Sequence, residues 1–241
     1  LCTTRQKGAL EKLVNKDILQ VCLNKKSTID IIAFIRLLRT IRSNKIELIH
    51  AHSSSVYWAI AAKMLIPEIR IIWHDHYGLS ENIKDNSRTI IRLLSRFISA
   101  IIAVNDNLRQ WSIRNTKIDQ DRILLINNFP YAVKNHKSTV PGVTTIVCLA
   151  NLRPQKDHST CIEAINIIKK EFPEINLEVI FAGLYWHDDY FFRLKRLIEE
   201  YNLSDTIKII GSVENSEELL SSADIGVLSS MSEGLPVSLL E

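Results

Sequence analysis

The feature that most constrains the fold is a regular alternation of short apolar runs with longer amphipathic stretches. Apolar runs typical of buried strands occupy residues 46–50, 69–73, 100–104, 123–126, 145–149, 177–182, 207–210 and 224–228. Between them, apolar residues recur every three or four positions, as on one side of a helix, at residues 57–65, 88–97, 107–113, 159–172, 190–201 and 216–222. Strands that alternate with helices favour a parallel sheet covered on both faces, so we expect an α/β fold.

The clearest amphipathic stretch precedes the first of these strands. Residues 28–41 place isoleucines, Phe34 and Leu38 on one side of a helix and Arg36, Arg39 and Arg42 elsewhere. A weaker pattern before it predicts a short helix at residues 10–14 and a strand at 18–23. The serines at 53–55 are expected to cap the helix that follows them, and Pro67 to end it.

A break in the alternation divides the chain in two. Residues 127–142 are rich in polar and turn-forming residues. We therefore expect two doubly wound parallel-sheet domains, residues 1–137 and 144–241, joined by a linker at 138–143. Because the chain begins with Leu1 and stops in the second turn of a predicted helix, we expect a fragment that lacks the first strand of its first domain and the end of its second.

The two halves carry opposite charge. Lys and Arg outnumber Asp and Glu by 22 to 11 in residues 1–140, whereas residues 141–241 hold 8 Lys and Arg against 16 Asp and Glu. A basic half can contact phosphates, nucleic acid or an anionic membrane surface. The helical spacing of the three arginines at 36, 39 and 42 favours phosphate or membrane, and no nucleic-acid-binding motif is present. We expect no nucleic-acid partner.

Cysteine usage and hydropathy indicate the compartment. The four cysteines show neither metal-ligand spacing nor a dense disulfide framework, which favours a reducing cytoplasm. No apolar run approaches the roughly 20 residues that span a bilayer. We expect a cytoplasmic protein, with peripheral contact at the inner face of the cytoplasmic membrane as a further possibility.

Two carboxylates stand at the end of the chain, separated by seven residues that include Gly234, Leu235 and Pro236. Glu233 falls in the loop after the last predicted strand, where ligands of open α/β sheets bind. Pro236 suits the first turn of a helix over residues 237–241, which would place Glu241 near the same loop. The alternative is an ordinary surface loop.

A basic pair follows the first strand of the second domain. Arg153 and Lys156 are predicted to project toward the same cleft as Glu233, and their charges suit a diphosphate, although each alone could be a solvated surface charge. Asp157 is predicted to cap the next helix. Glycines end two further strands, Gly183 and the Gly211-Ser212-Val213 segment, and either make turns or leave room for a flat group such as a nucleobase.

Four histidines end two strands of the first domain. His50 and His52 close one strand and His74 and His76 the next, so they could face one another across the sheet edge. They fit a metal site, but their spacing matches no zinc motif. Hydrogen-bonded strand-end histidines are the other interpretation. His76 is the better functional candidate because Gly78 allows a ligand to approach the backbone closely.

These segments together resemble the family-4 retaining glycosyltransferases of the GT-B fold, with two Rossmann-like domains, which build bacterial capsule, O-antigen and exopolysaccharide. The resemblance is carried by residues 49–53, 72–78, 104–106, 125–128, 149–157 and 223–241. The chain departs from the family in lacking an opening strand with its Gly-rich loop and the segments after the second Glu.

The resemblance implies a role for each candidate residue. Arg153 and Lys156 would bind the diphosphate of a UDP- or GDP-sugar, Glu233 the donor sugar, and Glu241 the ribose. His76 would lie near the reacting carbon and act with Glu233 in catalysis, Gly234 and Leu235 would contact the sugar, and Gly211 and Val213 the nucleotide. His52, His74 and Gly183 are secondary candidates.

The implied reaction is sugar transfer to a lipid-linked or saccharide acceptor, with hexosyl or N-acetylhexosaminyl specificity. Arg153 and Lys156 would neutralise the phosphates, so no metal cofactor is expected. A catalytically silent nucleotide- or glycan-binding module is the second hypothesis. A metal-dependent hydrolase built on the four histidines is the third.

Overall fold

The computed structural model describes residues 1–6, 11, 14–77, 88–129, 141–233 and 236–240. Within these ranges the chain forms parallel sheets flanked by helices, as the alternation predicts, and it divides into two compact units between Asn127 and Asn128. Of the predicted linker, residues 138–143, the described ranges include 141–143. The linker and the domain limits stay predictions.

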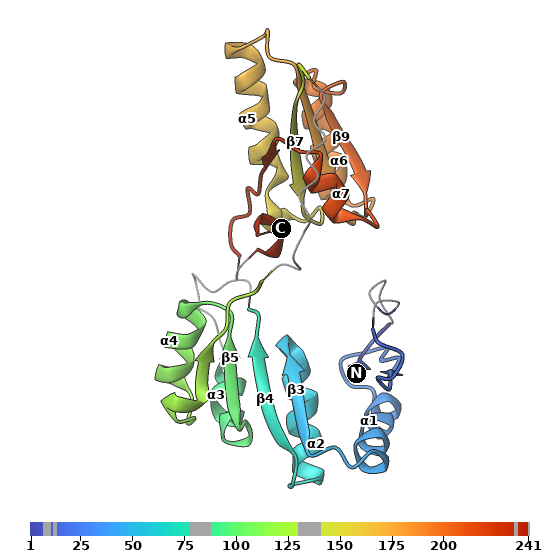
Figure 1. The fold of residues 1–241 in the computed structure, drawn as a ribbon, viewed down its shortest axis with the longest axis vertical. Helices are drawn as coiled ribbons and strands as arrows, with labels where there is room; N and C mark the ends of the chain where they lie inside the picture. Colours follow the sequence, from blue (N-terminus) through green and yellow to red (C-terminus); the bar gives the residue numbers. More distant parts are fainter. Residues whose placement is uncertain (7–10, 12–13, 78–87, 130–140, 234–235, 241) are drawn as a thin grey trace. The chain divides into compact units, whose positions relative to one another are not determined.

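The first unit contains a two-stranded and a four-stranded parallel sheet (Figure 1). In the larger sheet the strands lie in sequence order, β3-β4-β5-β6. The elements in chain order are β1 (Cys2–Thr3), β2 (Val21–Cys22), α1 (Ile31–Ser43), β3 (Leu48–His52), α2 (Val56–Leu65), β4 (Arg70–Asp75), α3 (Thr89–Leu94), β5 (Ala100–Ala103), α4 (Asp106–Asn115) and β6 (Ile123–Leu125).

The larger sheet of the first unit is buried unequally on its two faces. Side chains alternate between the faces of a strand, and one face carries Ala51, Trp73 and Ile101, which are almost fully buried in the core with residues of α2 and α4. The opposite face carries the histidines and Leu124, all half-buried or exposed. We expected helices to cover both faces. Among the described residues, however, this second face is more exposed than the first.

The second unit has four parallel strands in the order β10-β7-β8-β9. Residues of α5 and α6 pack with Val179 and Phe181 of β8 in one core, and α7 contacts β7. The elements are β7 (Thr144–Leu149), α5 (His158–Glu171), β8 (Leu177–Ala182), α6 (Asp189–Glu200), β9 (Ile207–Gly211), α7 (Ser216–Ser221) and β10 (Ile225–Gly226).

Most helices of the described ranges begin at a capping side chain, but the predicted serine cap of α2 is wrong. Short polar side chains accept a hydrogen bond from the first turn of α1, α4, α5, α6 and α7, as N-caps do: Asp30, Asn105, Asp157, Asp188 and Asn215. The serines 53–55 do not cap α2. They form a 3₁₀ turn of their own, because the Ser55 hydroxyl donates to the His52 carbonyl (2.6 Å) instead of accepting from α2.

The end of the chain also differs from the prediction. An α-helix was expected at 237–241, but Val237–Leu239 form a single 3₁₀ turn preceded by Pro236. Three residues allow too few i→i−4 hydrogen bonds to nucleate an α-helix. The helix predicted at 10–14 falls mainly on residues outside the described ranges.

Candidate functional site

The topology of the second unit places two loops side by side at the carboxyl ends of its strands. From β7 the chain proceeds outward to β8 and β9, and then returns to add β10 on the other side of β7. The point where the strand order reverses is where open α/β sheets bind ligands. Here it lies between the loop after β7, which holds Arg153 and Lys156, and the loop after β10, which holds Glu233.

The loop after β7 leads directly into α5 through a strained residue. Residues Pro154–Lys156 form a 3₁₀ turn, and Asp157 follows in the left-handed region with φ +46°. The Asp157 carboxylate accepts from the hydroxyls of Ser159 and Thr160 (both 2.7 Å), which hold its pKa below the usual value. Its predicted capping role is therefore confirmed. The start of this 14-residue helix adds a partial positive charge to the loop.

Hydrogen bonds join this loop to the loop after β10. The Gln155 side-chain amide donates to the carbonyl of Ser232 (3.0 Å), and the Met231 amide donates to the carbonyl of Gln155 (3.0 Å). The Ser229 hydroxyl donates to the carbonyl of Asp157 (2.7 Å). Each of these hydrogen bonds ends on a backbone carbonyl, so the two loops are held together. The positions of Lys156 and Glu233 relative to each other are therefore fixed.

Lys156 and Glu233 form an ion pair across these loops. Their side chains are 25% and 22% exposed, so the pair is largely covered but still reachable from solvent. The predicted convergence of the basic loop with Glu233 is thus present for Lys156. A cation held beside a carboxylate at a switch point can exchange that carboxylate for a phosphate.

Arg153 takes a different position from Lys156. Its guanidinium lies 5.0 Å from the centroid of the Trp186 ring, in a cation–π contact, and its side chain is exposed. Trp186 follows β8 and is itself 43% exposed. Sequence patterns did not single it out, because a tryptophan in a loop has no periodic signal. The contact leaves the guanidinium accessible while limiting the orientations of its side chain.

Gly183, after β8, and Gly211, at the end of β9, are required for different structural reasons. A Cβ on Gly183 would lie 2.2 Å from the Ala150 carbonyl oxygen, so this glycine permits the close approach of the chain's own backbone. Gly211 adopts φ +77° and faces the Tyr185 ring, which a Cβ would meet at 3.5 Å. Val213 lies half-buried in the loop between β9 and α7. Gly234, Leu235 and Glu241 lie outside the described residues, as does Gly78.

The four strand-end histidines of the first unit gather on one face of the sheet. His52 lies directly across from His74 in the β3–β4 pairing. The Nδ1 of His52 is 3.1 Å from the Nε2 of His76, and the rings of His74 and His76 are 4.1 Å apart. The expected facing arrangement is confirmed. The ring nitrogens of His50, His52 and His74 come within 4.8 Å of one another, close enough to be considered as metal ligands.

Desolvation favours the neutral form of His52, His74 and His76. Desolvation lowers the pKa of His74 to about 4, and it also lowers the pKa of His52 and of His76. Mutual repulsion between the rings adds to the effect for His74 and His52. Neutral rings can each donate one hydrogen bond and accept another, so this face can bind either polar hydroxyls or a metal ion.

A buried ion pair that the sequence patterns did not reveal lies on the opposite face. The Arg88 guanidinium contacts the Asp75 carboxylate at 2.6 Å, with the two side chains 9% and 2% exposed. The same guanidinium lies over the rings of Trp73, Tyr77 and Trp111. Desolvation raises the pKa of Asp75 although Arg88 opposes the shift. Strand alternation would have shown that Asp75 is buried, but not which cation it meets.

Among the described residues the four cysteines are free, with Cys148 and Cys161 buried. Burial raises the pKa of Cys148 to about 12 and that of Cys161 to about 11, so neither is a reactive thiolate. Among the described helices, none is both long and apolar enough to span a bilayer.

Comparison with known proteins gives matches over almost the whole chain. The family described as Glycosyl transferases group 1 matches residues 134–241. The capsular polysaccharide biosynthesis glycosyltransferase CapH of Staphylococcus aureus is 24% identical over 221 residues, which make up 86% of this chain and 59% of CapH. This chain therefore spans about three fifths of that relative.

Solved structures show the same fold. HepE of Anabaena, in complex with UDP and glucose, superposes with a TM-score of 0.73 at 16% identity, over 95% of this chain and 66% of HepE. A glycosyltransferase from Rickettsia africae gives a TM-score of 0.66 at 20% identity, over 95% of this chain and 64% of its own. The fold is thus the GT-B fold. Because the family described as Glycosyltransferase Family 4 matches residues 1–129, more than half of the chain, the protein belongs to that family.

Proposed function

We propose that the protein transfers a hexosyl or N-acetylhexosaminyl group from a UDP- or GDP-sugar to a lipid-linked or saccharide acceptor, with retention of the anomeric configuration. The observation that carries this proposal is the ion pair of Lys156 with Glu233 at the switch point between β7 and β10. Family membership supports it, as do CapH, named for capsule biosynthesis, and HepE, which holds UDP and glucose.

The proposed chemistry follows from the charges at this site. Cleavage of the bond between sugar and diphosphate builds negative charge on the leaving group and positive charge on the sugar. Lys156, Arg153 and the start of α5 would stabilise the leaving diphosphate. When the phosphate takes Lys156, the Glu233 carboxylate is released to position sugar hydroxyls. Protein cations then supply the charge that a metal would otherwise supply, so we propose transfer without a metal cofactor.

The remaining contacts are proposed on the resemblance alone. Glu241 would hold the ribose, Gly211 and Val213 the nucleotide, and Gly234 and Leu235 the sugar. In the first unit, His76 would approach the reacting carbon, and its hydrogen-bond distance from His52 supports a role in orienting a hydroxyl. We propose that the protein works in the cytoplasm at the inner face of the membrane, with no nucleic-acid partner.

A silent binding module is the second candidate. It is favoured by one observation: Lys156 and Arg153, the cations that suit a diphosphate, both lie in the loop after β7, which can bind a nucleotide without any group that transfers the sugar. A module of this kind would bind a nucleotide or glycan through the same loops.

Turnover of radiolabelled UDP- and GDP-sugars by the 241-residue chain separates the candidates. Release or transfer of labelled sugar that is unchanged by EDTA supports the transferase, and NMR of the product's anomeric proton tests retention. Binding without turnover supports the silent module. Activity that EDTA abolishes would contradict the metal-free mechanism, and a chain that neither binds nor turns over any donor would contradict both candidates.

A further inference from the structure

Helix α1 carries a second apolar set that is exposed among the described residues of the first unit. Ala33 and Ile41 are buried, and this face packs on the core of the first unit. Isoleucines in and just before the first turns point away from it: Ile29, Ile31, Ile32 and Ile35 are 84%, 70%, 66% and 41% exposed. Four exposed isoleucines within seven residues form a local apolar surface that singly scattered residues would not.

Basic residues continue this surface along the helix. Ile32, Ile35, Arg39 and Arg42 follow one another at spacings of three and four, so they lie on one stripe of α1. We call the exposed residues Ile29, Ile31, Ile32, Ile35, Arg39 and Arg42 the α1 surface. Neither arginine has an ion-pair partner among the residues that the structure describes.

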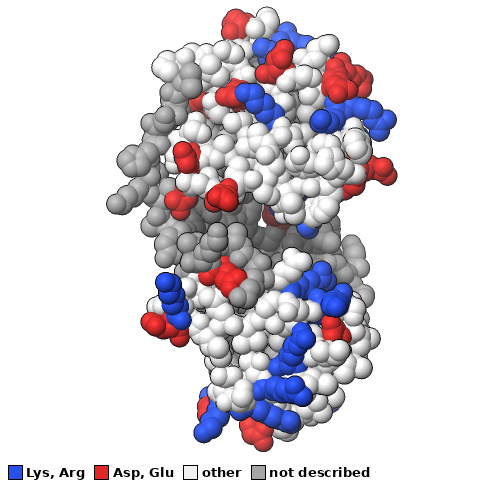
Figure 2. Space-filling view, turned by 90° about the vertical axis from the view of Figure 1, so that its right-hand side faces the viewer, with Lys and Arg blue, Asp and Glu red and all other residues white. Residues whose placement is uncertain are grey.

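The surroundings of the α1 surface are also basic. Between Cys22 and Glu47 the chain carries six Lys and Arg residues, and Asp30, the N-cap of α1, is the single acidic one. Figure 2 looks onto the side of the first unit that carries α1 in Figure 1, and a row of Lys and Arg side chains crosses it. We leave Arg36 out of the α1 surface, because its guanidinium donates a hydrogen bond to the Leu23 carbonyl (3.0 Å).

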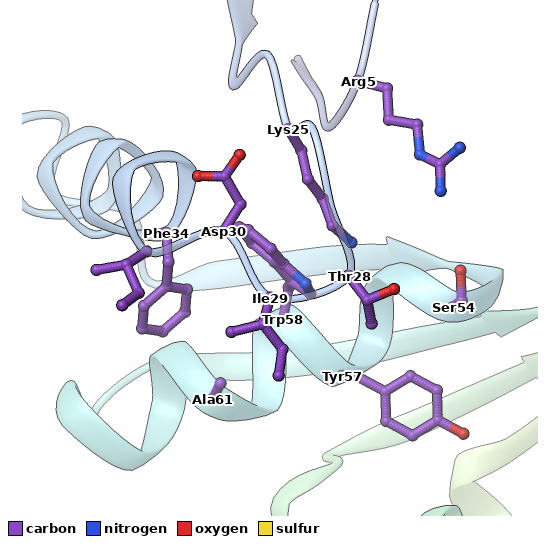
Figure 3. Close-up of a pocket in the computed structure, with 11 residues that line it drawn as sticks. Arg5, Lys25, Thr28, Ile29, Asp30, Phe34, Ser54, Tyr57, Trp58 and Ala61 are labelled. Carbon is purple, nitrogen blue, oxygen red and sulfur yellow. The ribbon is translucent and has the colours of Figure 1, made fainter.

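A cavity of about 490 Å³ opens at the N-terminal end of α1. Figure 3 shows Lys25 reaching into it beside Trp58 of α2, with Arg5 and Tyr57 at its edge. The Lys25 ammonium lies 4.5 Å from the centroid of the Trp58 ring. Cations next to the amphipathic rings of Trp and Tyr form the combination that sits at the headgroup level of bilayers.

We infer that the α1 surface binds an anionic lipid bilayer, with its isoleucines inserted at the headgroup boundary and Arg39 and Arg42 on lipid phosphates. Apolar side chains next to cations on one helix match the two requirements of interfacial binding. A second copy of the chain fits less well, because a two-fold contact would set the arginines either against each other or against the apolar isoleucines of the second copy. The inference assigns the proposed membrane contact to a specific surface. It rests on the proposed function only for the purpose of that contact, which is access to a lipid-linked acceptor.

Vesicle flotation with the full chain tests the inference. We expect binding to phosphatidylcholine vesicles that contain roughly a third phosphatidylglycerol, weak binding to phosphatidylcholine alone, and a marked loss as NaCl rises from about 0.1 to about 0.5 M. Arg39→Gln with Arg42→Gln is expected to weaken binding roughly 30-fold, given two surface cations. Ile29→Ser with Ile32→Ser is expected to weaken it roughly tenfold or more.

Matched controls come from the second unit. Ile167→Ser on α5, where the side chain is 54% exposed, and Arg196→Gln on α6 should leave vesicle binding unchanged. All four changed positions of the α1 surface are exposed, so folding should be preserved and circular dichroism checks it.

The inference is overturned if the wild type does not float with anionic vesicles, if neutral vesicles bind equally, or if the α1 variants bind like the controls. UDP titration of the same proteins keeps the two proposals apart. Vesicle binding without UDP binding contradicts the proposed function alone, whereas UDP binding without vesicle binding contradicts this inference alone.

Discussion

Lys156 and Glu233, 77 positions apart in the sequence, form an ion pair that spans the two loops at the switch point of the second sheet. The pair does more than hold the loops together, since backbone-directed hydrogen bonds from Gln155 and Ser229 already do that. It places a cation and a carboxylate next to each other at the point where a ligand of such a sheet binds. A diphosphate that takes the cation leaves the carboxylate free for the sugar.

Removal of the Glu233 charge should therefore separate binding from transfer. In Glu233→Gln, UDP no longer competes with a carboxylate for Lys156. We expect UDP to bind about fivefold more tightly, in line with a partly exposed ion pair of about 1 kcal/mol, while sugar transfer falls by roughly 100-fold or more. Calorimetry and a transfer assay measure the two effects. Glu199→Gln, on the exposed side of α6, is the control, and weaker UDP binding by Glu233→Gln would contradict the exchange.

The Gly183 position should tolerate no side chain. In Gly183→Ala the new methyl group would lie 2.2 Å from the Ala150 carbonyl oxygen, so β7 and β8 must move apart locally. We expect the free energy of unfolding to fall by about 3 kcal/mol. Denaturant titration measures it. Gly226→Ala is the matched variant, because nothing lies within 4 Å of its Cβ position; equal stability of the two variants would show that the close approach is absent.

Stability should fall in mild acid because of His158. This ring is fully buried beside Phe181, and desolvation lowers its pKa from 6.5 to about 4. Between these values the unfolded chain binds a proton that the folded chain does not, so the free energy of unfolding decreases as the pH falls from about 6.5 toward 4, by up to roughly 3 kcal/mol.

Replacing the His158 imidazole with a ring that cannot bind a proton tests whether His158 causes the pH dependence. His158→Phe should reduce the dependence of unfolding free energy on pH over that window, whatever its stability at neutral pH. Ile162→Val, a buried change in the same core that alters no titratable group, should leave the dependence as in the wild type. An unchanged slope in His158→Phe would assign the acid sensitivity to other groups.

Loss of Arg88 should destabilise the first unit strongly. Arg88→Ala leaves the Asp75 carboxylate buried without its partner and removes the cation from three aromatic rings. We expect a loss of about 3–5 kcal/mol in the free energy of unfolding. Arg109→Ala, from an exposed pair with Asp106 at 3.9 Å, should cost well under 1 kcal/mol. A similar small effect at both positions would mean that the buried pair adds nothing.

Much of this architecture could be predicted from the sequence, for a physical reason. Strand β8 has the predicted bounds, and β7 and α5 differ from the predicted ranges by one residue, because buried parallel strands are near-continuous apolar runs and helices show their period. The meeting of Lys156 with Glu233 was also predictable, since carboxyl ends of adjacent parallel strands share one edge.

Other features depend on contacts that no local pattern encodes. The partner of Asp75 lies 13 positions away, and Trp186 meets Arg153 through two different loops. The open histidine face of the first sheet was also missed, because alternation predicts which residues share a face but not which face is covered. The period placed the isoleucines of α1 on one side of the helix and the arginines elsewhere, which was wrong: Ile32 and Ile35 are exposed and share a stripe with Arg39 and Arg42.

Calorimetric titration of the chain with UDP and with GDP shows whether Lys156 and Arg153 bind the diphosphate of a nucleotide sugar. We expect saturable binding of one of the two nucleotides, weakened at least roughly tenfold in Lys156→Met and in Arg153→Ala, and unchanged in Arg196→Gln. Binding of equal strength in all four proteins, or no binding of either nucleotide to the wild type, would contradict this binding role.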